Sequence, residues 1–280
     1  MDRPSWAPPD VDIERPTASR IYDYMLGGSY NFAADREVAE KAIAAMPELP
    51  AVLRENRAFL GRAVRWLAED AGVTQFLDLG SGIPTVGNVH DIAGRIHPET
   101  RVVYVDIDPI AVAHSLAILR GNPNATAIQA DLSDPPAILA DPAVTATLDL
   151  RRPVAVLLVA ALHFLPDSKH PADVLVRLRE SLPSGSYVAI THATEDVQPM
   201  TGQRDAQDVY ERSNNPVIMR TYGQIATLLD GWDLVPPGIV RCPAWHPDPG
   251  DEVGPEASTF PGYAAVARIS PPESGPEERL

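Results

Sequence analysis

Two glycines and an acid stand at the ends of two apolar runs, with the spacing of a nucleotide-binding turn. The run Gln75–Leu79 ends in a turn that holds Gly80 and Gly82, and the run 101–105, one helix length further on, ends in Asp106. Glycines let the backbone approach a ligand closely, and a carboxylate at the tip of the second strand accepts hydrogen bonds from both hydroxyls of a ribose. The pattern predicts a site for an adenosine-containing ligand.

The turn differs from the one that binds dinucleotides. That fingerprint places a third small residue three positions after the second glycine, where this chain has Thr85 preceded by Pro84. The turn therefore suits a ligand that has no pyrophosphate to seat on the helix N-terminus. The alternative is a tight strand-to-helix turn without a ligand, which leaves the placement of Asp106 a coincidence.

Further polar residues follow the ends of later strands, where folds of this kind place their ligands. Asp131 can accept a hydrogen bond from an adenine amino group, or it can cap the segment that follows. Asp108 either points to the same side as Asp106 or caps the next helix, and capping is the favoured interpretation. His163 and His192 are candidates for a general base, although a histidine in an apolar stretch is as often a core residue.

An alternation of strands and helices must position these residues. Short apolar runs predict strands over 75–79, 101–105, 126–129, 153–159 and 186–191, with helical patterns between them. Two further candidates, 232–240 and 263–269, have no crossover helix between them and are expected to pair antiparallel. Pro236 and Pro237 fall inside the first candidate, which predicts a bent strand or an edge strand.

The segments before and after this repeat indicate how the chain is divided. Amphipathic patterns predict helices over 18–26, 33–46, 52–71 and 85–97. Because most of these precede the first strand, residues 1–72 are expected to form an N-terminal helical cap and residues 73–270 the core. The polar segment 195–216 interrupts the repeat as a lid or a helical insert. Residues 271–280 are charged and rich in proline, which predicts a disordered tail.

The composition narrows the classes of partner. With 280 residues, 45% of them hydrophobic, and a formal net charge of −15, the chain can form a sizeable core and repels phosphate backbones. We therefore expect a small-molecule partner and no nucleic acid. Cys242 is the only cysteine, so no multi-cysteine zinc site can form and no metal is expected.

The sequence shows no signal-peptide pattern and no apolar run long enough to span a bilayer. These observations predict a cytoplasmic protein with no membrane partner. The sequence does not decide whether the protein is a homodimer.

The sequence resembles class I S-adenosylmethionine-dependent methyltransferases in four features. These are the glycine turn, the acid Asp106 at the end of the second strand, residues 130–132 after the third strand, and the antiparallel strands expected at the end of the chain. The strings 18–36, 56–60 and 157–164 are similar to an actinobacterial family of S-adenosyl methyltransferases without a settled acceptor. The resemblance implies an α/β, doubly wound Rossmann-like sheet of seven strands with strand 7 antiparallel, and S-adenosyl-L-methionine as the cofactor. It implies that the cofactor is bound by Gly80, Ser81, Gly82, Asp106, Ile107, Asp131, Leu132 and Ala160.

The N-terminal string mixes aromatic and polar residues around a double glycine. We hypothesise that it folds over the cofactor mouth and that Tyr22, Tyr24 and Asn31 contribute to the acceptor pocket. The alternative is a packing motif that fixes the cap to the core.

The predicted function is methyl transfer to a small molecule. Transfer from a sulfonium depends mainly on positioning and desolvation, and a base is needed only where the acceptor must lose a proton. His163 or His192 is the candidate for that base. Two alternatives stay open: a protein that binds S-adenosylmethionine without catalysis and signals to a partner, and an NAD-dependent oxidoreductase. Three features disfavour the oxidoreductase. They are Thr85 in place of the third small residue of a dinucleotide site, Asp131, and the antiparallel strands expected at the end of the chain.

Overall fold

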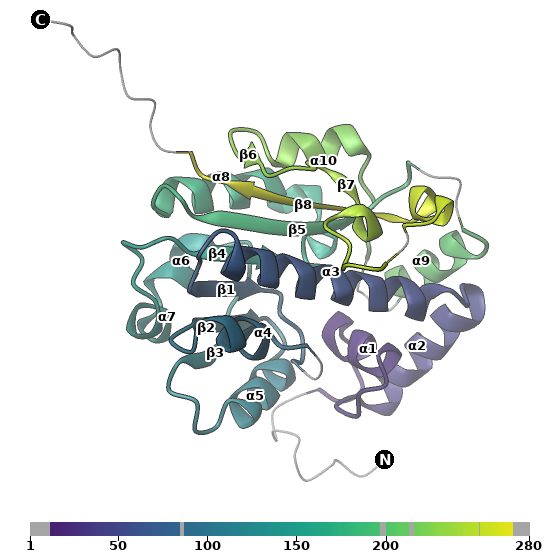
Figure 1. Ribbon diagram of the computed structural model, residues 1–280. Helices are drawn as coiled ribbons and strands as arrows, with labels where there is room; N and C mark the ends of the chain where they lie inside the picture. Colours follow the sequence, from purple (N-terminus) through teal and green to yellow (C-terminus); the bar gives the residue numbers. More distant parts are fainter. Residues whose placement is uncertain (1–11, 85–86, 197–199, 213–215, 252, 271–280) are drawn as a thin grey trace, which may run out of the picture.

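The computed structural model places the predicted strands in one mixed sheet (Figure 1). It describes residues 12–84, 87–196, 200–212, 216–251 and 253–270. The strand order is β3-β2-β1-β4-β5-β8-β6, and β7 also pairs with β8. The strands are β1 (Gln75–Leu79), β2 (Arg101–Asp106), β3 (Ala125–Gln129), β4 (Ala155–Leu158), β5 (Tyr187–Ala193), β6 (Asp233–Leu234), β7 (Val240–Arg241) and β8 (Gly262–Arg268). Strands β1 to β5 run parallel and β8 runs antiparallel to β5, which confirms the Rossmann-like α/β fold with antiparallel strands at one edge.

Helices connect these strands and precede them. The α-helices are α1 (Ala18–Met25), α2 (Ala33–Ala45), α3 (Leu49–Glu69), α4 (Val89–Ile96), α5 (Pro109–Ile118), α6 (Pro135–Ala140), α7 (Pro142–Thr147), α8 (Pro171–Ser181), α9 (Gln203–Arg212) and α10 (Tyr222–Leu228). Within the described ranges, no helix combines the length and the hydropathy that crossing a bilayer requires.

The expected strand 232–240 is divided in the structure. Its ends form the two-residue strands β6 and β7, which pair with opposite ends of β8. Pro236 and Pro237 lie between them, and proline has no N–H to donate to a ladder, so a continuous strand cannot form there. Over the described ranges the sheet therefore has eight strands, two of them very short.

Two helix starts differ from the prediction. Helix α3 begins at Leu49 instead of near residue 52, because Pro50 is tolerated in the first turn, where its missing N–H has no intrahelical partner. Helix α4 begins at Val89, after a loop in which Gly87 adopts a positive φ. The predicted start at Thr85 and the predicted tail at 271–280 lie outside the described residues.

The core lies on both faces of the sheet, because side chains alternate along each strand. From β1, Leu77 and Leu79 face one cluster and Phe76 faces the other. Helices α6, α7, α8 and α10 cover the first face, and α3, α4 and α5 cover the second. In Figure 1, α3 crosses in front of the sheet.

A third cluster joins the N-terminal helices to the segment predicted as a lid or insert. That segment contains α9, which packs on α2 through buried residues such as Ala39 and Tyr210. Helices α1, α2 and α9 group at one side of the molecule, on the right in Figure 1. They stand over the carboxyl ends of the parallel strands, where the candidate site lies.

Candidate functional site

A cavity of about 610 Å³ lies where the carboxyl ends of β1, β2 and β4 meet the N-terminal helices, and we call it the main cavity. The strand order reverses between β1 and β4, which is the switch point where open α/β sheets bind ligands. The structure brings all of the predicted cofactor-binding residues to the walls of this cavity: Gly80, Ser81, Gly82, Asp106, Ile107, Asp131, Leu132 and Ala160.

Asp106 ends β2 with its carboxylate already oriented. The backbone N–H of Gly82 donates to Oδ2 at 2.7 Å, and the N–H of Asp108 donates to Oδ1 at 2.8 Å. Each carboxylate oxygen has a further lone pair, so the group can still accept two hydroxyl hydrogen bonds. Burial raises the pKa of Asp106 to about 6, against the opposing effect of the two N–H donors.

The turn after β1 requires glycine more strictly at one position than at the other. Gly80 has a φ of +72°, and a Cβ there would lie 2.8 Å from the Cβ of Ala161. Gly82 has a φ of +63°, with open space where its Cβ would stand. Both backbones are left-handed, but only Gly80 is also packed against a neighbouring strand end.

Gly80→Ala is therefore expected to destabilise the fold more than Gly82→Ala. The left-handed conformation costs an L-residue roughly 1–2 kcal/mol in either variant. Overpacking against Ala161 adds roughly 1–3 kcal/mol in Gly80→Ala alone. Thermal denaturation should show the larger fall in Tm for Gly80→Ala, and equal falls would mean that the backbone relaxes away from Ala161.

An acid and an arginine that the sequence analysis did not single out also line the main cavity. Asp78 lies within β1, and burial raises its pKa to about 7 although Arg57 opposes this shift. The Nε of Arg57 is buried without a hydrogen-bond partner among the described residues. This pair suits a ligand that carries both a carboxylate and an ammonium group. An acid inside the apolar run Gln75–Leu79 is the signal from which Asp78 could have been found.

Asp131 lies beside Lys169, whose Nζ is 2.6 Å from Oδ2. Burial by itself raises the pKa of Asp131, but hydrogen bonds from Lys169 and Ser133 hold it below its ordinary value. The N–H of Ser133 donates to Oδ1, so the acid also caps the local turn. Its contact with an adenine amino group stays a prediction. Sequence reasoning missed Lys169, because 38 residues separate it from Asp131.

A smaller cavity of about 130 Å³ adjoins the main cavity, and we call it the inner cavity. The two cavities share several wall residues, among them Tyr22, Asn56 and Ala160. Both predicted base candidates, His163 and His192, line the inner cavity with their ring centroids 5.8 Å apart.

His192, near the end of β5, uses both of its ring nitrogens. Its Nδ1 lies 2.8 Å from the carbonyl oxygen of Ala193, and its Nε2 lies 2.8 Å from Nη1 of Arg220. Because arginine can only donate, Nε2 is the unprotonated nitrogen and Nδ1 carries the proton. Burial lowers the pKa of His192 to about 4, and the charge of Arg220 adds to this effect. His192 can act as a base only after Arg220 moves.

His163 differs from His192 in having an unpaired nitrogen. Its Nδ1 is buried and has no hydrogen-bond partner in the part of the chain that the structure describes. Burial lowers its pKa to about 3, with a smaller effect of the nearby His192 and Arg220. The side chain is therefore neutral at physiological pH, and its Nδ1 can donate a hydrogen bond to a ligand or accept one from it, depending on the tautomer.

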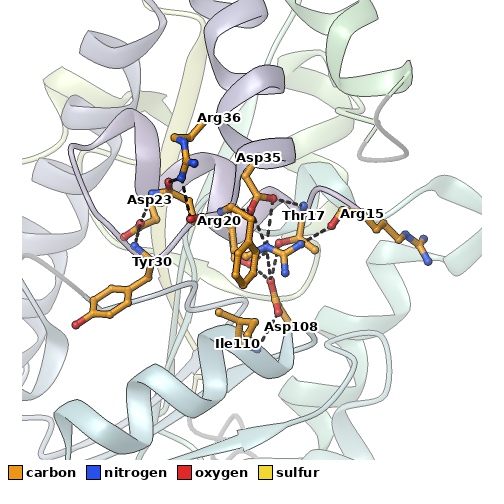
Figure 2. A network of polar contacts seen from close by, with 12 residues as sticks. Arg15, Thr17, Arg20, Asp23, Tyr30, Asp35, Arg36, Asp108 and Ile110 are labelled. Atoms are coloured by element: carbon orange, nitrogen blue, oxygen red, sulfur yellow. Dashed lines mark hydrogen bonds and ion pairs between the residues drawn. The ribbon is translucent and has the colours of Figure 1, made fainter. Parts of the chain in front are cut away.

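Asp108 connects the end of β2 with the N-terminal helices (Figure 2). It caps α5 by accepting a hydrogen bond from the N–H of Ile110 at 2.9 Å, which confirms the favoured interpretation. Its Oδ2 also accepts hydrogen bonds from the hydroxyls of Thr17 at 2.5 Å and Ser19 at 3.0 Å. Thr17 is the N-cap residue of α1, but its side chain makes no capping hydrogen bond, because this hydroxyl is bonded to Asp108 instead.

Arg20 lies between two acids at this junction, as Figure 2 shows. Its Nε is 3.1 Å from Oδ2 of Asp35 and 3.7 Å from Oδ2 of Asp108. All three side chains are buried. The guanidinium also lies over the ring of Phe32 at 5.0 Å from its centroid. The junction joins α1, α2 and α5 two residues from Asp106.

The predicted substrate-binding residues lie in different places. Tyr22 lines both cavities, and its hydroxyl accepts a hydrogen bond from Asn56 at 3.1 Å. Asn31 is buried in a scaffold, where it donates to the carboxylate of Asp23. The hydroxyl of Tyr24 donates to an exposed glutamate of α2. Among the described wall residues of the two cavities, Tyr22 is present and Tyr24 and Asn31 are not.

Comparisons with known proteins agree with this geometry. The family described as S-adenosyl methyltransferase matches residues 4–270. A DUF574 family protein from Streptomyces avermitilis MA-4680 is 40% identical and superposes with a TM-score of 0.87, over 93% of this chain and 100% of that chain. A protein from Thermobifida fusca YX is 38% identical, with a TM-score of 0.89 over 96% of this chain and 100% of that chain. No curated protein matches this chain.

Proposed function

We propose that this chain, which belongs to the S-adenosyl methyltransferase family, transfers the methyl group of S-adenosyl-L-methionine to a small-molecule acceptor. Family membership implies binding of S-adenosylmethionine. The observation that carries the proposal is the convergence of the glycine turn, Asp106 and Asp131 on one cavity that adjoins a second, mainly apolar one.

The residues of the main cavity fit the chemical parts of S-adenosylmethionine. Asp106 would accept hydrogen bonds from the ribose hydroxyls, and the side chain of Ile107, 64% exposed, would pack against the adenine. Arg57, whose Nε is buried and has no hydrogen-bond partner among the described residues, would bind the carboxylate of the methionine portion. When bound, S-adenosylmethionine supplies a methyl group on a positively charged sulfur, which is electrophilic without further activation.

The rest of the chain would position the acceptor and exclude water. Displacement at a methyl carbon needs the acceptor atom in line with the breaking bond, so a closed pocket beside the cofactor accounts for much of the rate. The inner cavity shares Ala160 and Tyr22 with the main cavity, and the buried residues Ala206 and Tyr210 of α9 also line it. These features support a small molecule as the acceptor.

The proposal is tested by titrating the protein with S-adenosylmethionine, S-adenosylhomocysteine and NAD in a calorimeter. We expect micromolar binding of the first two and no binding of NAD, because the turn after β1 lacks the third small residue of a dinucleotide site. Binding of NAD alone would overturn the proposal. Formation of S-adenosylhomocysteine with an acceptor separates a methyltransferase from a protein that binds the cofactor without catalysis.

The affinity for S-adenosylmethionine is expected to depend on pH through Asp106. Its pKa of about 6 in the free protein exceeds the ordinary value, so this acid favours folding below pH 4 and that contribution is lost as the pH rises through 6. Ribose hydroxyls stabilise the carboxylate, so binding must displace a proton at acid pH. The association constant should fall by up to about tenfold per pH unit below 6.

Calorimetry between pH 5 and pH 8 measures this dependence, with Asp106→Asn as the control. Asp78, with a pKa of about 7, is present in both proteins, but the charge of Asp106 helps to raise that pKa, so it should be lower in the variant and should flatten the variant's profile further. The variant should bind more weakly at pH 7.5 and show a flatter profile. A wild-type profile that is flat from pH 5 to pH 7 would contradict the assignment of Asp106.

A further inference from the structure

The described lining of the inner cavity carries no charged side chain, although the adjoining main cavity is lined by several acids and arginines. No aspartate, glutamate, lysine or arginine is among the described residues that line it. Apolar side chains make up most of its walls, including Met46, Leu49, Phe164, Val217 and Met219. Its volume of about 130 Å³ is close to that of an engineered cavity of about 150 Å³ that binds benzene. The space therefore matches one six-membered ring.

The titratable groups in these walls are neutral at physiological pH. Burial raises the pKa of Tyr22, Tyr210 and Cys242 above their ordinary values. Burial lowers the pKa of His163 and His192. Transfer of an ionised group from water into such an environment is unfavourable unless a counter-charge accompanies it.

Arg220, a buried cation that contacts the wall residue His192, is paired with an acid and hydrogen-bonded through both of its Nη atoms. Its Nη2 pairs with Asp167 and donates to the carbonyl oxygen of Leu165. Its Nη1 donates to His192 and to the carbonyl oxygen of Leu162. Arg220 thus holds both ends of the segment that contains His163, and offers the cavity no free charge. Sequence reasoning missed it, since its partners lie 28 to 58 residues away.

We infer that the methyl acceptor is an uncharged ring compound with a hydroxyl group, that its ring occupies the inner cavity, and that its hydroxyl hydrogen-bonds to His163. This inference rests on the proposed function and specifies its substrate class. A hydroxyl can donate to or accept from either form of a neutral imidazole, so it satisfies the unpaired Nδ1 whichever nitrogen carries the proton. A charged amine or carboxylate in the same place has no counter-charge among the described walls.

In the proposed transfer step, atoms, electrons and charge balance. A lone pair of the acceptor oxygen forms the bond to the methyl carbon, and the carbon–sulfur bond breaks with its electron pair left on sulfur. The sulfonium becomes the neutral thioether of S-adenosylhomocysteine. The hydroxyl proton passes through His163 to water, which leaves a methyl ether and no buried charge.

Four ring compounds test the charge and hydroxyl requirements separately. We would titrate p-cresol, tyramine, 4-hydroxyphenylacetate and toluene into protein saturated with S-adenosylhomocysteine. The first three share a phenol and differ in charge, and toluene lacks the hydroxyl. We expect p-cresol to bind at least tenfold more tightly than the cation, the anion or toluene. Equal or tighter binding of either ion would overturn the inference.

His163→Ala distinguishes recognition by this side chain from support of the cavity shape. It should weaken p-cresol binding about tenfold and leave toluene binding unchanged, whereas a collapsed cavity would weaken both. His97→Ala, at the end of α4 and outside both cavities, is the matched control and should change neither. Equal losses for both compounds in His163→Ala would overturn the role assigned to this residue.

Two outcomes separate the inference from the proposed function. If S-adenosylhomocysteine binds and none of the ring compounds does, the inference fails and the proposed function stands. If S-adenosylhomocysteine itself does not bind, the proposed function fails and the inference fails with it.

Discussion

Replacement of Asp106 by alanine is expected to weaken S-adenosylmethionine binding about 100-fold or more. Two hydrogen bonds to a buried carboxylate contribute roughly 1.5–3 kcal/mol each, and both are lost together in the variant. The carboxylate is held in place by the N–H groups of Gly82 and Asp108, so the wild-type protein does not have to reorganise to bind a ribose. Calorimetric titration of wild type and variant at pH 7.5 measures the difference.

A second acid controls for the removal of negative charge. Asp91→Ala, on the exposed side of α4 and outside both cavities, removes the same charge without touching the site and should leave the affinity unchanged. Circular dichroism and thermal denaturation test whether Asp106→Ala folds like the wild type. An affinity for the cofactor within threefold of wild type, in a folded variant, would refute the assignment of Asp106 to the ribose.

Arg20→Ala is expected to destabilise the protein by about 3–5 kcal/mol, the cost of leaving the partner of a buried ion pair without its counter-charge. The side chain of Arg20 is 1% exposed and that of Asp35 is fully buried, so water cannot replace the guanidinium. Since Asp108 belongs to the same junction, the docking of α1 onto the end of β2 should loosen as well. Denaturant unfolding of the full chain measures the free-energy change.

The exposed pair Lys41–Glu37 provides a matched comparison within α2, one of the N-terminal helices. Its nitrogen–oxygen distance is 2.7 Å, but the two side chains are 61% and 68% exposed. Lys41→Ala should change the free energy of unfolding far less than Arg20→Ala does, because solvent screens an exposed helix pair. Similar effects of Arg20→Ala and Lys41→Ala would mean that the buried junction contributes no more to stability than a surface contact.

The parts of the site that follow directly from a strand could be predicted from the sequence. An apolar run that ends in glycine, and another that ends in an acid, determine by local backbone geometry that Gly80, Gly82 and Asp106 stand at strand ends. In a parallel sheet, the carboxyl ends of the strands lie at the same edge, and this holds independently of contacts with the rest of the chain. The capping role of Asp108 was predictable for the same reason, since a cap depends on neighbours two residues away.

Pairings between distant segments could not be predicted in this way. Lys169 and Asp131 are 38 residues apart, and Arg220 and His192 are 28 residues apart, and no sequence period relates the members of either pair. Asp78 carries a local signal, but the sequence alone does not indicate that Arg57 lies near it. The position of Tyr22 at both cavities, and of Tyr24 away from them, depends on how α1 docks.

The sequence by itself therefore determined the class of fold, the order of its repeating elements and the residues at strand ends, because each of these depends on short-range periodicity and backbone conformation. For the described residues, the tertiary structure alone decided which charges are paired, which histidine has a nitrogen without a hydrogen-bond partner and that the lining of the inner cavity carries no charge. Burial and pairing are properties of neighbours in space, and in this chain those neighbours come from the N-terminal helices, from β4 and β5, and from the segment before α10.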